Sequence, residues 1–330
     1  MRKKLPPYMI FDYLSKKVIA VITSIAEKSG WDQPPRGIRY YGAYSMMSAI
    51  LYYYIAQLGS LDTLEGELHH DLAVREACGF EDFTPSKTTL SLFMQRLGAG
   101  PVKELFDELV KLMQEEGLVT GRHLAIDSTH VNAWSDRKST DKKDPEFKIA
   151  KNCDFARLGR TPKGFDICYR VQTATVTNSE IPIAIEILPG NTNDKKAFEG
   201  IFEKALEVIF NPLVVSADKG YSSGKNRQLV DDVGAMCIIR PTKTDLKGHP
   251  MEFFLPEELI EEKYWKLYTR RLAVERTYSR TKGFSRLGQP RVVNEEPVRQ
   301  HVFLSFVCHL LMVLVSAEMG LKQTKYSLFS

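Results

Sequence analysis

Three acidic residues, far apart in the chain, could share one catalytic site. Asp127 and Asp218 each follow a short apolar run, at 124–126 and 213–217, and Glu275 lies in a strongly basic stretch. An ionised carboxylate directly after a buried strand is costly unless it reaches solvent, a cation or a metal. Ligands bind at the carboxyl ends of strands in open α/β sheets, so the two aspartates could meet if their strands are neighbours. Taken singly, each could equally be a turn residue.

Carboxylates without a matching group of cysteines or histidines favour a hard, oxygen-preferring cation such as Mg²⁺ or Mn²⁺. Two such ions about 4 Å apart can clamp the attacking and leaving oxygens of a phosphoryl displacement. We therefore predict that Asp127, Asp218 and Glu275 are catalytic and bind two Mg²⁺ or Mn²⁺ ions.

The stretch around Glu275 carries an unusual concentration of positive charge. Nine bases and this single acid lie between residues 263 and 291. If the stretch is one continuous helix ending before Gly283, four functional side chains share an arc of about 60°. These are Tyr268, Arg271, Glu275 and Lys282. Cations beside an acid at that spacing suit contacts to the phosphates of DNA.

The elements that must position these residues change in character near residue 120. Up to residue 119 the apolar spacing is helical, which predicts an all-α N-terminal domain over 1–119. Residues 120–330 predict, in order, a strand, a two-stranded hairpin, a helix, a strand, a helix, a strand and a long helical region. This order predicts an α/β domain with five strands. The Lys-rich segment 136–164 is expected to be a surface insertion.

Composition fits a globular chain that is not embedded in a membrane. The 330 residues include 43% apolar ones, and the net charge of +4 is too small to identify a partner. Five cysteines without a Cys-x-x-Cys pair predict a reducing compartment rather than disulfides or a zinc site. The apolar run 302–317 is shorter than a membrane span and predicts a buried helix. We expect no signal peptide and a cytoplasmic location.

Together, these motifs resemble the insertion-sequence DDE transposases that carry a Tyr-x2-Arg-x3-Glu-x6-Lys signature. Tyr268, Arg271, Glu275 and Lys282 match that signature at every position. Asp127-Ser128 and Asp218-Lys219-Gly220-Tyr221 look like the motifs of the family's first two aspartates, in the expected order. The segments 72–80, 85–91 and 189–194 are similar as well, so the resemblance covers about 60–317.

The resemblance implies a ribonuclease H-like fold, a mixed five-stranded sheet flanked by helices, after an all-α N-terminal domain. It implies that the three acids hold two divalent ions, that one DNA strand is hydrolysed at the element's end, and that the freed 3′-hydroxyl attacks target DNA. It also implies a homodimer on DNA and a nucleoid-associated, prokaryotic setting. The expected DNA contacts are Tyr268, Arg271, Lys282, Lys219 and Arg276.

Two alternatives stay open: a metal-dependent nuclease without strand transfer, and a non-enzymatic DNA-binding protein derived from a transposase. The helical half could bind DNA ends, because the helices around 85–97 could form a helix-turn-helix.

Several further residues have structural roles in our interpretation. His130 is expected on the strand face opposite Asp127. Asn193 or Asp194 is expected to cap the next helix, with Asp194 a helix N-cap rather than a fourth ligand. Trp134 and Trp265 are expected in the core rather than stacked on unpaired bases.

Overall fold

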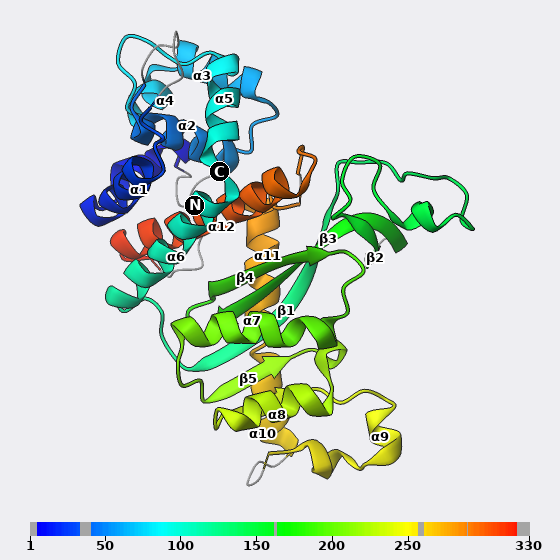
Figure 1. Cartoon of the computed structure of the whole chain (residues 1–330). Coiled ribbons are helices and arrows are strands. Elements are labelled where there is room, and N and C mark those ends of the chain that lie inside the picture. Colours follow the sequence, from blue (N-terminus) through cyan, green and yellow to red (C-terminus); the bar gives the residue numbers. More distant parts are fainter. Residues whose placement is uncertain (1–4, 34–40, 162–163, 257–260, 289, 322–330) are drawn as a thin grey trace. The chain divides into compact units, whose positions relative to one another are not determined.

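The computed structural model describes residues 5–33, 41–161, 164–256, 261–288 and 290–321 (Figure 1). The chain divides into two compact units. One unit is helical and combines Met1–Glu116 with Arg280–Ser330, and the other contains the sheet and spans Gly117–Ser279. In this division the described residues between 280 and 321 fall in the helical unit, whereas we expected one domain over 120–330.

Helices form the described part of the first unit, as their apolar spacing predicts. They are η1 (Pro7–Tyr13), α1 (Lys16–Lys28), α2 (Ala43–Ile55), α3 (Leu61–His70), α4 (Leu72–Ala77), α5 (Lys87–Leu97), α6 (Ala99–Glu115) and α12 (Glu295–Glu318). Several of these helices begin with an N-cap residue whose side chain accepts a hydrogen bond from an amide of the first turn, and this bond stabilises the start of the helix. Ser86, an expected N-cap, accepts from the amide of Thr89 at the start of α5.

Helix α12 explains why the C-terminal segment packs with the helices. Its 24 residues are apolar on every side and almost all are buried, from Val298 to Ser316. A helix without a polar face must be covered all round, and α6 and α2 pack against it. It is long and apolar enough to cross a membrane, but 94% of its most apolar window lies inside the protein, as expected for a core helix.

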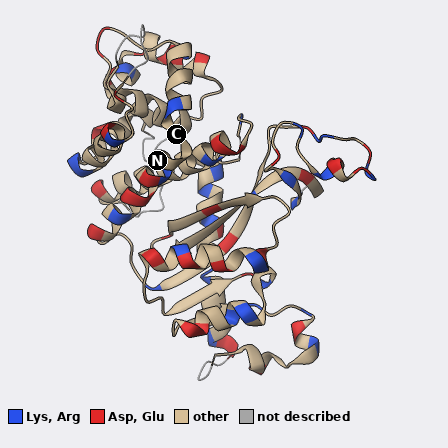
Figure 2. Ribbon diagram, in the orientation of Figure 1, with Lys and Arg blue, Asp and Glu red and all other residues tan. Residues whose placement is uncertain are grey.

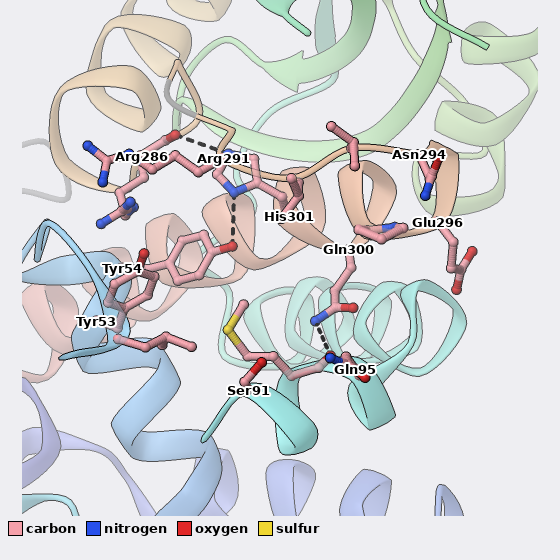
Figure 3. Close-up of a pocket in the computed structure, with 15 residues that line it drawn as sticks. Tyr53, Tyr54, Ser91, Gln95, Arg286, Arg291, Asn294, Glu296, Gln300 and His301 are labelled. Carbon is pink, nitrogen blue, oxygen red and sulfur yellow. Dashed lines mark hydrogen bonds between the residues drawn. The ribbon is translucent and has the colours of Figure 1, made fainter. Parts of the chain in front are cut away.

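A cavity of about 590 Å³ lies within this unit (Figure 3). Its polar walls are held by contacts inside the unit. Tyr54 and the Nδ1 atom of His301 lie 2.9 Å apart, and the guanidinium of Arg286 lies 4.2 Å from the ring centroid of Tyr53. Burial lowers the pKa of His301 to about 4, so this ring is neutral at neutral pH.

The second unit is built on a mixed sheet of six strands. They are β1 (His123–Asn132), β2 (Arg157–Thr161), β3 (Gly164–Val176), β4 (Ile181–Pro189), β5 (Val214–Ala217) and β6 (Met236–Ile239). The order is β2-β3-β1-β5-β6, and β4 pairs with β3. β1 is antiparallel to β3 and parallel to β5, which is parallel to β6.

We had expected five strands, and β2 is the sixth. It lies inside the segment predicted to be a surface insertion and pairs with the beginning of β3, and Arg157 also forms a bridge with Ile149. Its five residues include two arginines and a glycine, so it lacks the apolar alternation that marks a strand in a sequence.

Helices cover both faces of this sheet. The sheet unit contains η2 (Pro145–Lys148), α7 (Asp194–Val208), η3 (Lys219–Tyr221), α8 (Gly224–Asp232), α9 (Asp245–Gly248), η4 (Met251–Phe254) and α10 (Glu261–Thr269). Helix α11 (Leu272–Phe284) begins in this unit. In Figure 1, α7 and α11 lie on opposite faces of the strands.

The basic stretch is two helices rather than the single one we predicted. α10 ends at Thr269 and α11 starts at Leu272, with a turn at Arg270 and Arg271 between them. The amides of Ala273 and Val274 bond to the carbonyls three residues earlier, as in a tight turn. No Pro or Gly marks the break, and α11 continues through Gly283 to Phe284.

The Lys-rich segment before β2 carries charges of both signs (Figure 2). Lys138 pairs with Asp154 at 2.8 Å, and the guanidinium of Arg137 lies 4.3 Å from the ring centroid of Phe147. Trp134 corrects our expectation of a core residue, because it is 61% exposed. Trp265 is half-buried and donates to Glu261 at 3.0 Å.

All five cysteines are buried and unpaired, as expected for a chain without disulfides. Burial raises the pKa of the thiols of Cys78, Cys168, Cys237 and Cys308.

Candidate active site

The parallel pair β1 and β5 brings the first two acids together. Ile126 pairs with Ala217 at the end of this ladder, and Asp127 and Asp218 are the next residues on the two strands. The apolar residues before them are buried, and both aspartates are only partly exposed. The two aspartates therefore meet at neighbouring strand ends, the arrangement that would let them share one ligand.

Arg271 links two of the three acids. Its Nη1 atom lies 2.6 Å from Oδ2 of Asp127, and its Nη2 atom lies 2.6 Å from Oε1 of Glu275. The side chains of Arg271 and Asp127 are 12% and 18% exposed, whereas that of Glu275 is 48% exposed. The turn between α10 and α11 thus carries a guanidinium that joins a buried carboxylate to a more exposed one.

Two tyrosines complete the surroundings of the aspartates. Tyr268 donates to Oδ1 of Asp218 at 3.2 Å, and burial raises its pKa, so the phenol keeps its proton at neutral pH. Tyr278 on α11 donates to the main-chain oxygens of Asp127 and Val171, at 2.8 and 3.1 Å. α11 is therefore fastened to β1 and β3 beside the first aspartate.

The electrostatics favour a cation at this position. Burial raises the pKa of Asp127 to about 7, the guanidinium of Arg271 opposes that shift, and the carboxylates of Asp218 and Glu275 add to it. Asp127 thus lies close enough to both other acids to respond to their charges. A buried cluster of like charges is stabilised by a counter-ion, and Arg271 provides one.

The donor set fits a divalent metal by its chemistry. Carboxylate oxygens are the ligands that Mg²⁺ and Mn²⁺ prefer. Among the described residues, no three His, Cys, Asp or Glu side chains lie close enough together to hold a metal ion. Arg271 already occupies oxygens of Asp127 and Glu275, so these two residues could serve as ligands once the guanidinium gives up those pairs.

The residues expected to contact DNA lie in different settings. Arg276 pairs with Glu180 at 2.6 Å, and Arg271 and Tyr268 contact the acids themselves. Lys219 is exposed directly after Asp218. Lys282 lies on the last turn of α11, where burial lowers its pKa.

Sequence reasoning missed a second polar cluster, on the other face of the sheet. We expected Asn193 or Asp194 to cap this helix, and Asn193 does so by accepting from the amide of Lys195. The carboxylate of Asp194 instead pairs with Arg170, at 2.6 and 2.7 Å. Arg170 and Gln172 are polar at alternate positions of an otherwise apolar strand, and that pattern is the signal that could have revealed the cluster.

His130 belongs to this cluster. Its Nε2 atom lies 2.9 Å from Nη2 of Arg170. In the β1–β3 register, His130 pairs with Arg170 and Ser128 pairs with Gln172. Asp127 is an odd number of residues from both Ser128 and His130, so its side chain lies on the other face of the strand. The expectation that His130 lies on the strand face opposite Asp127 is therefore confirmed.

Two family models match this chain. The family model described as "Transposase DDE domain" matches residues 120–311, and a model described as "Transposase domain (DUF772)" matches residues 16–96. Among proteins with curated functions, none matches this chain.

Two solved structures are similar at low identity. A piggyBac transposase synaptic complex with hairpin DNA shares 8% identity at a TM-score of 0.48, over 98% of this chain and 78% of that one. A Mos1 transposase paired-end complex with the left transposon end shares 12% identity at a TM-score of 0.23, over 78% and 82%. Scores under 0.5 carry no argument about this chain. The DDE-domain model spans more than half of the 330 residues, and on that ground the chain belongs to the family of DDE transposases.

Proposed function

We propose that this chain is the transposase of an insertion sequence, which cuts DNA at the element's ends and joins the freed 3′-hydroxyl to target DNA. The observation that carries the proposal is the meeting of Asp127 and Asp218 at adjacent strand ends, with Glu275 joined to Asp127 through Arg271. The strand order, an antiparallel β3–β1 pair beside the parallel strands β1, β5 and β6, is the support for a ribonuclease H-like fold.

In this proposal the three acids hold two Mg²⁺ or Mn²⁺ ions. Bound there, the ions would activate the attacking oxygen and stabilise the leaving one. Arg271 would exchange its carboxylate partners for a phosphate of DNA, since a guanidinium suits either anion. Tyr268 would keep the carboxylate of Asp218 oriented through its hydrogen bond.

The partners follow from the same proposal. Lys219, exposed beside Asp218, together with Arg276 and Lys282, would contact the DNA backbone. The helical unit would bind the element's end, and two copies of the chain would act together on paired ends in the cytoplasm of a prokaryote.

The direct test uses a labelled duplex carrying the inverted repeat that flanks the coding region. We expect cleavage at the element's end with Mg²⁺ and none with EDTA. The variant Asp218→Asn should abolish cleavage yet keep DNA affinity and thermal stability, whereas Asp231→Asn, an acid on α8, should behave like the wild type. Normal cleavage by Asp218→Asn would contradict the assignment.

A second arm separates the transposase from a plain nuclease. A pre-cleaved end with a free 3′-hydroxyl is mixed with a target plasmid, and joined products are counted. We expect joining. Hydrolysis without joining would favour the nuclease, and DNA binding without either reaction would favour the non-enzymatic alternative.

A further inference from the structure

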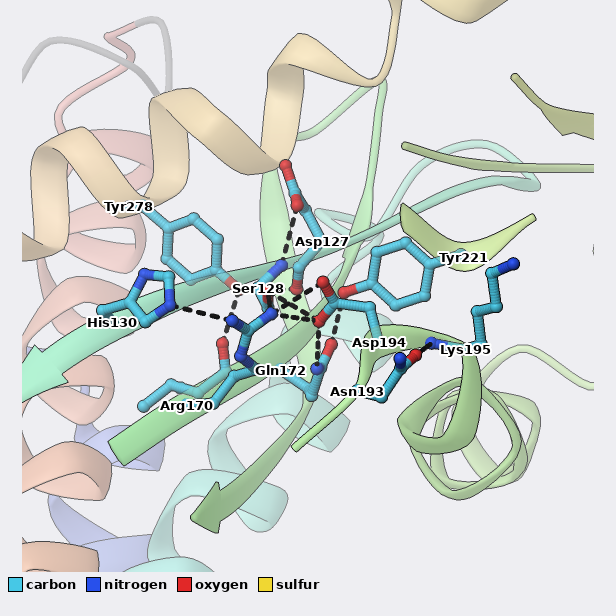
Figure 4. A network of polar contacts seen from close by, with 11 residues as sticks. Asp127, Ser128, His130, Arg170, Gln172, Asn193, Asp194, Lys195, Tyr221 and Tyr278 are labelled. Atoms are coloured by element: carbon cyan, nitrogen blue, oxygen red, sulfur yellow. Dashed lines mark hydrogen bonds and ion pairs between the residues drawn. The ribbon is translucent and has the colours of Figure 1, made fainter. Parts of the chain in front are cut away.

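Beneath the three acids, on the opposite face of the sheet, lies a buried polar cluster that includes Arg170 and Asp194 (Figure 4). The Asp194 carboxylate accepts from Arg170, from the hydroxyl of Ser128 at 3.0 Å and from the amide of Gln172 at 3.0 Å. Gln172 in turn accepts from the phenol of Tyr221. One carboxylate therefore organises side chains from β1, β3 and the turn after β5.

The cluster is connected to both aspartates through the main chain. Ser128 is the residue directly after Asp127, and Tyr221 closes the short 3-10 helix that begins just after Asp218. A Cβ atom on Gly220, in that same turn, would lie 3.3 Å from Oδ2 of Asp194. Asp194 thus lies against the backbone that follows both strand ends.

The side chains of this polar cluster are largely buried. Gln172 and Tyr221 are 0% and 1% exposed, and the side chains of Arg170 and Asp194 are 12% and 21% exposed. A buried ion pair gives little net stability, because desolvation offsets most of the attraction. The Asp194 carboxylate and the Gln172 amide are hydrogen-bonded within the cluster, whereas Nε of Arg170 has no partner among the described residues. Such buried bonds fix the relative placement of the elements that they join.

Helix α7 holds the carboxylate in place. Asp194 is the first residue of α7, where the helix dipole favours a negative charge. Phe198, on the next turn, packs against Tyr221 with ring centroids 6.0 Å apart. The helix therefore presses the carboxylate and an aromatic ring against the strand ends at the same time.

We propose that Asp194 is a positioning residue: held by Arg170, its carboxylate fixes the strand ends that carry Asp127 and Asp218, and so sets the spacing of the two metal-binding carboxylates. This inference rests on the proposed function for its catalytic consequence. The placement itself concerns this chain alone and can be tested without DNA.

The test compares Asp194→Asn with Glu186→Gln. Glu186 lies on β4 and pairs with Lys204 of the same helix α7 at 2.5 Å, and its side chain is 19% exposed. The control variant therefore neutralises a carboxylate of similar exposure that lies beside the cluster, opposite Gln172 in the β3–β4 register, but pairs with Lys204 of α7. A double variant, Arg170→Gln with Asp194→Asn, tests the partnership: the two effects should be less than additive.

Hydrogen–deuterium exchange of the full chain measures how well the strand ends are held, without DNA or metal. In Asp194→Asn we expect protection to fall at residues 127–129 and 219–222, and to stay unchanged there in Glu186→Gln. Unchanged protection at both segments in Asp194→Asn would overturn the inference.

Titration with Mn²⁺, followed by the paramagnetic resonance of the free ion, measures the metal affinity of the proposed site. Residues that orient metal ligands typically change affinity 10–100-fold, and we expect a loss of about tenfold for Asp194→Asn. A loss no larger than in Glu186→Gln would also overturn the inference. If the wild type neither binds Mn²⁺ nor cleaves DNA, the proposed function fails, and the exchange experiment still decides whether Asp194 positions the strand ends.

Discussion

Arg271 holds its Nη1 atom 2.6 Å from Oδ2 of Asp127, the distance of a close, charge-assisted hydrogen bond. A guanidinium and a metal ion at that oxygen compete for the same negative charge and repel each other, so binding of one weakens binding of the other. The pair therefore makes the proposed metal site sensitive to whatever draws Arg271 away.

Removing this competitor should change metal affinity in the absence of DNA. In Arg271→Met we expect Mn²⁺ to bind more tightly, by about 1 kcal/mol or about fivefold. The same variant should melt at a lower temperature without metal, because Asp127 loses its counter-ion, and Mn²⁺ should restore most of that loss. Arg276→Met, which breaks the pair with Glu180, is the control for both measurements. Equal Mn²⁺ affinity in all three proteins would mean that Arg271 does not compete.

The two hydrogen bonds of Tyr278 should contribute measurably to stability. Tyr278→Phe leaves the main-chain oxygens of Asp127 and Val171 without this donor, at about 1–2 kcal/mol for a buried loss of this kind. Tyr264→Phe removes the bond to the carbonyl of Ile239 and should cost about as much, because each phenol has one proton to donate. Urea denaturation of both variants gives the comparison. A loss in Tyr278→Phe well below that in Tyr264→Phe would contradict the bonding we describe.

Lys282 should contribute to DNA affinity through charge. Lys282→Ala should weaken binding and reduce the slope of the logarithm of affinity against the logarithm of salt concentration by up to about one. Lys225→Ala, an exposed lysine on α8, should leave the slope unchanged. Fluorescence anisotropy with a labelled duplex at several salt concentrations measures both, and an unchanged slope in Lys282→Ala would exclude a phosphate contact.

Acid should destabilise the chain through His301. Its pKa is about 4 in the folded protein and about 6.5 when unfolded, so the unfolded state binds more protons between these values. The contribution of neutral His301 to the free energy of unfolding is fully present above about pH 6.5 and is lost as the pH drops toward 4. Between pH 7.5 and 5 the loss from this residue is about 2 kcal/mol.

The variant His301→Gln should lack the part of the pH dependence that His301 contributes and keep the part from His123, whose pKa burial also lowers to about 4. It should be less stable than the wild type at pH 7.5 because the contact with Tyr54 is lost. Exposed His70, changed to Gln, is the control. Denaturation at the two pH values gives the difference for each protein. The same pH dependence in His301→Gln and the wild type would show that His301 is not the titrating group.

The strand ends were predictable from the sequence, because an aspartate directly after an apolar run marks the point where a buried strand ends. That reasoning anticipated the adjacency of Asp127 and Asp218. The break at Arg270 and Arg271 was not predictable, because no Pro or Gly marks it. The arc that we drew through Tyr268 and Lys282 therefore assumed a helix that is in fact interrupted.

Two other features depended on tertiary contacts that a single sequence does not display. Helix α12 was expected to be buried, but its partners α6 and α2 lie some two hundred residues earlier in the chain. Asp194 was a plausible N-cap by its position, and only the pairing of β1 with β3 brings Arg170 and Ser128 within reach of it.

The burial of all five cysteines makes this chain convenient for spectroscopy. A thiol that is shielded and reluctant to ionise reacts slowly with maleimides and similar reagents. A cysteine introduced at an exposed position such as Lys225 would therefore react first and take up a single dye or spin label, with all five native cysteines left in place. Distances from such a label could then be followed while the protein assembles on DNA.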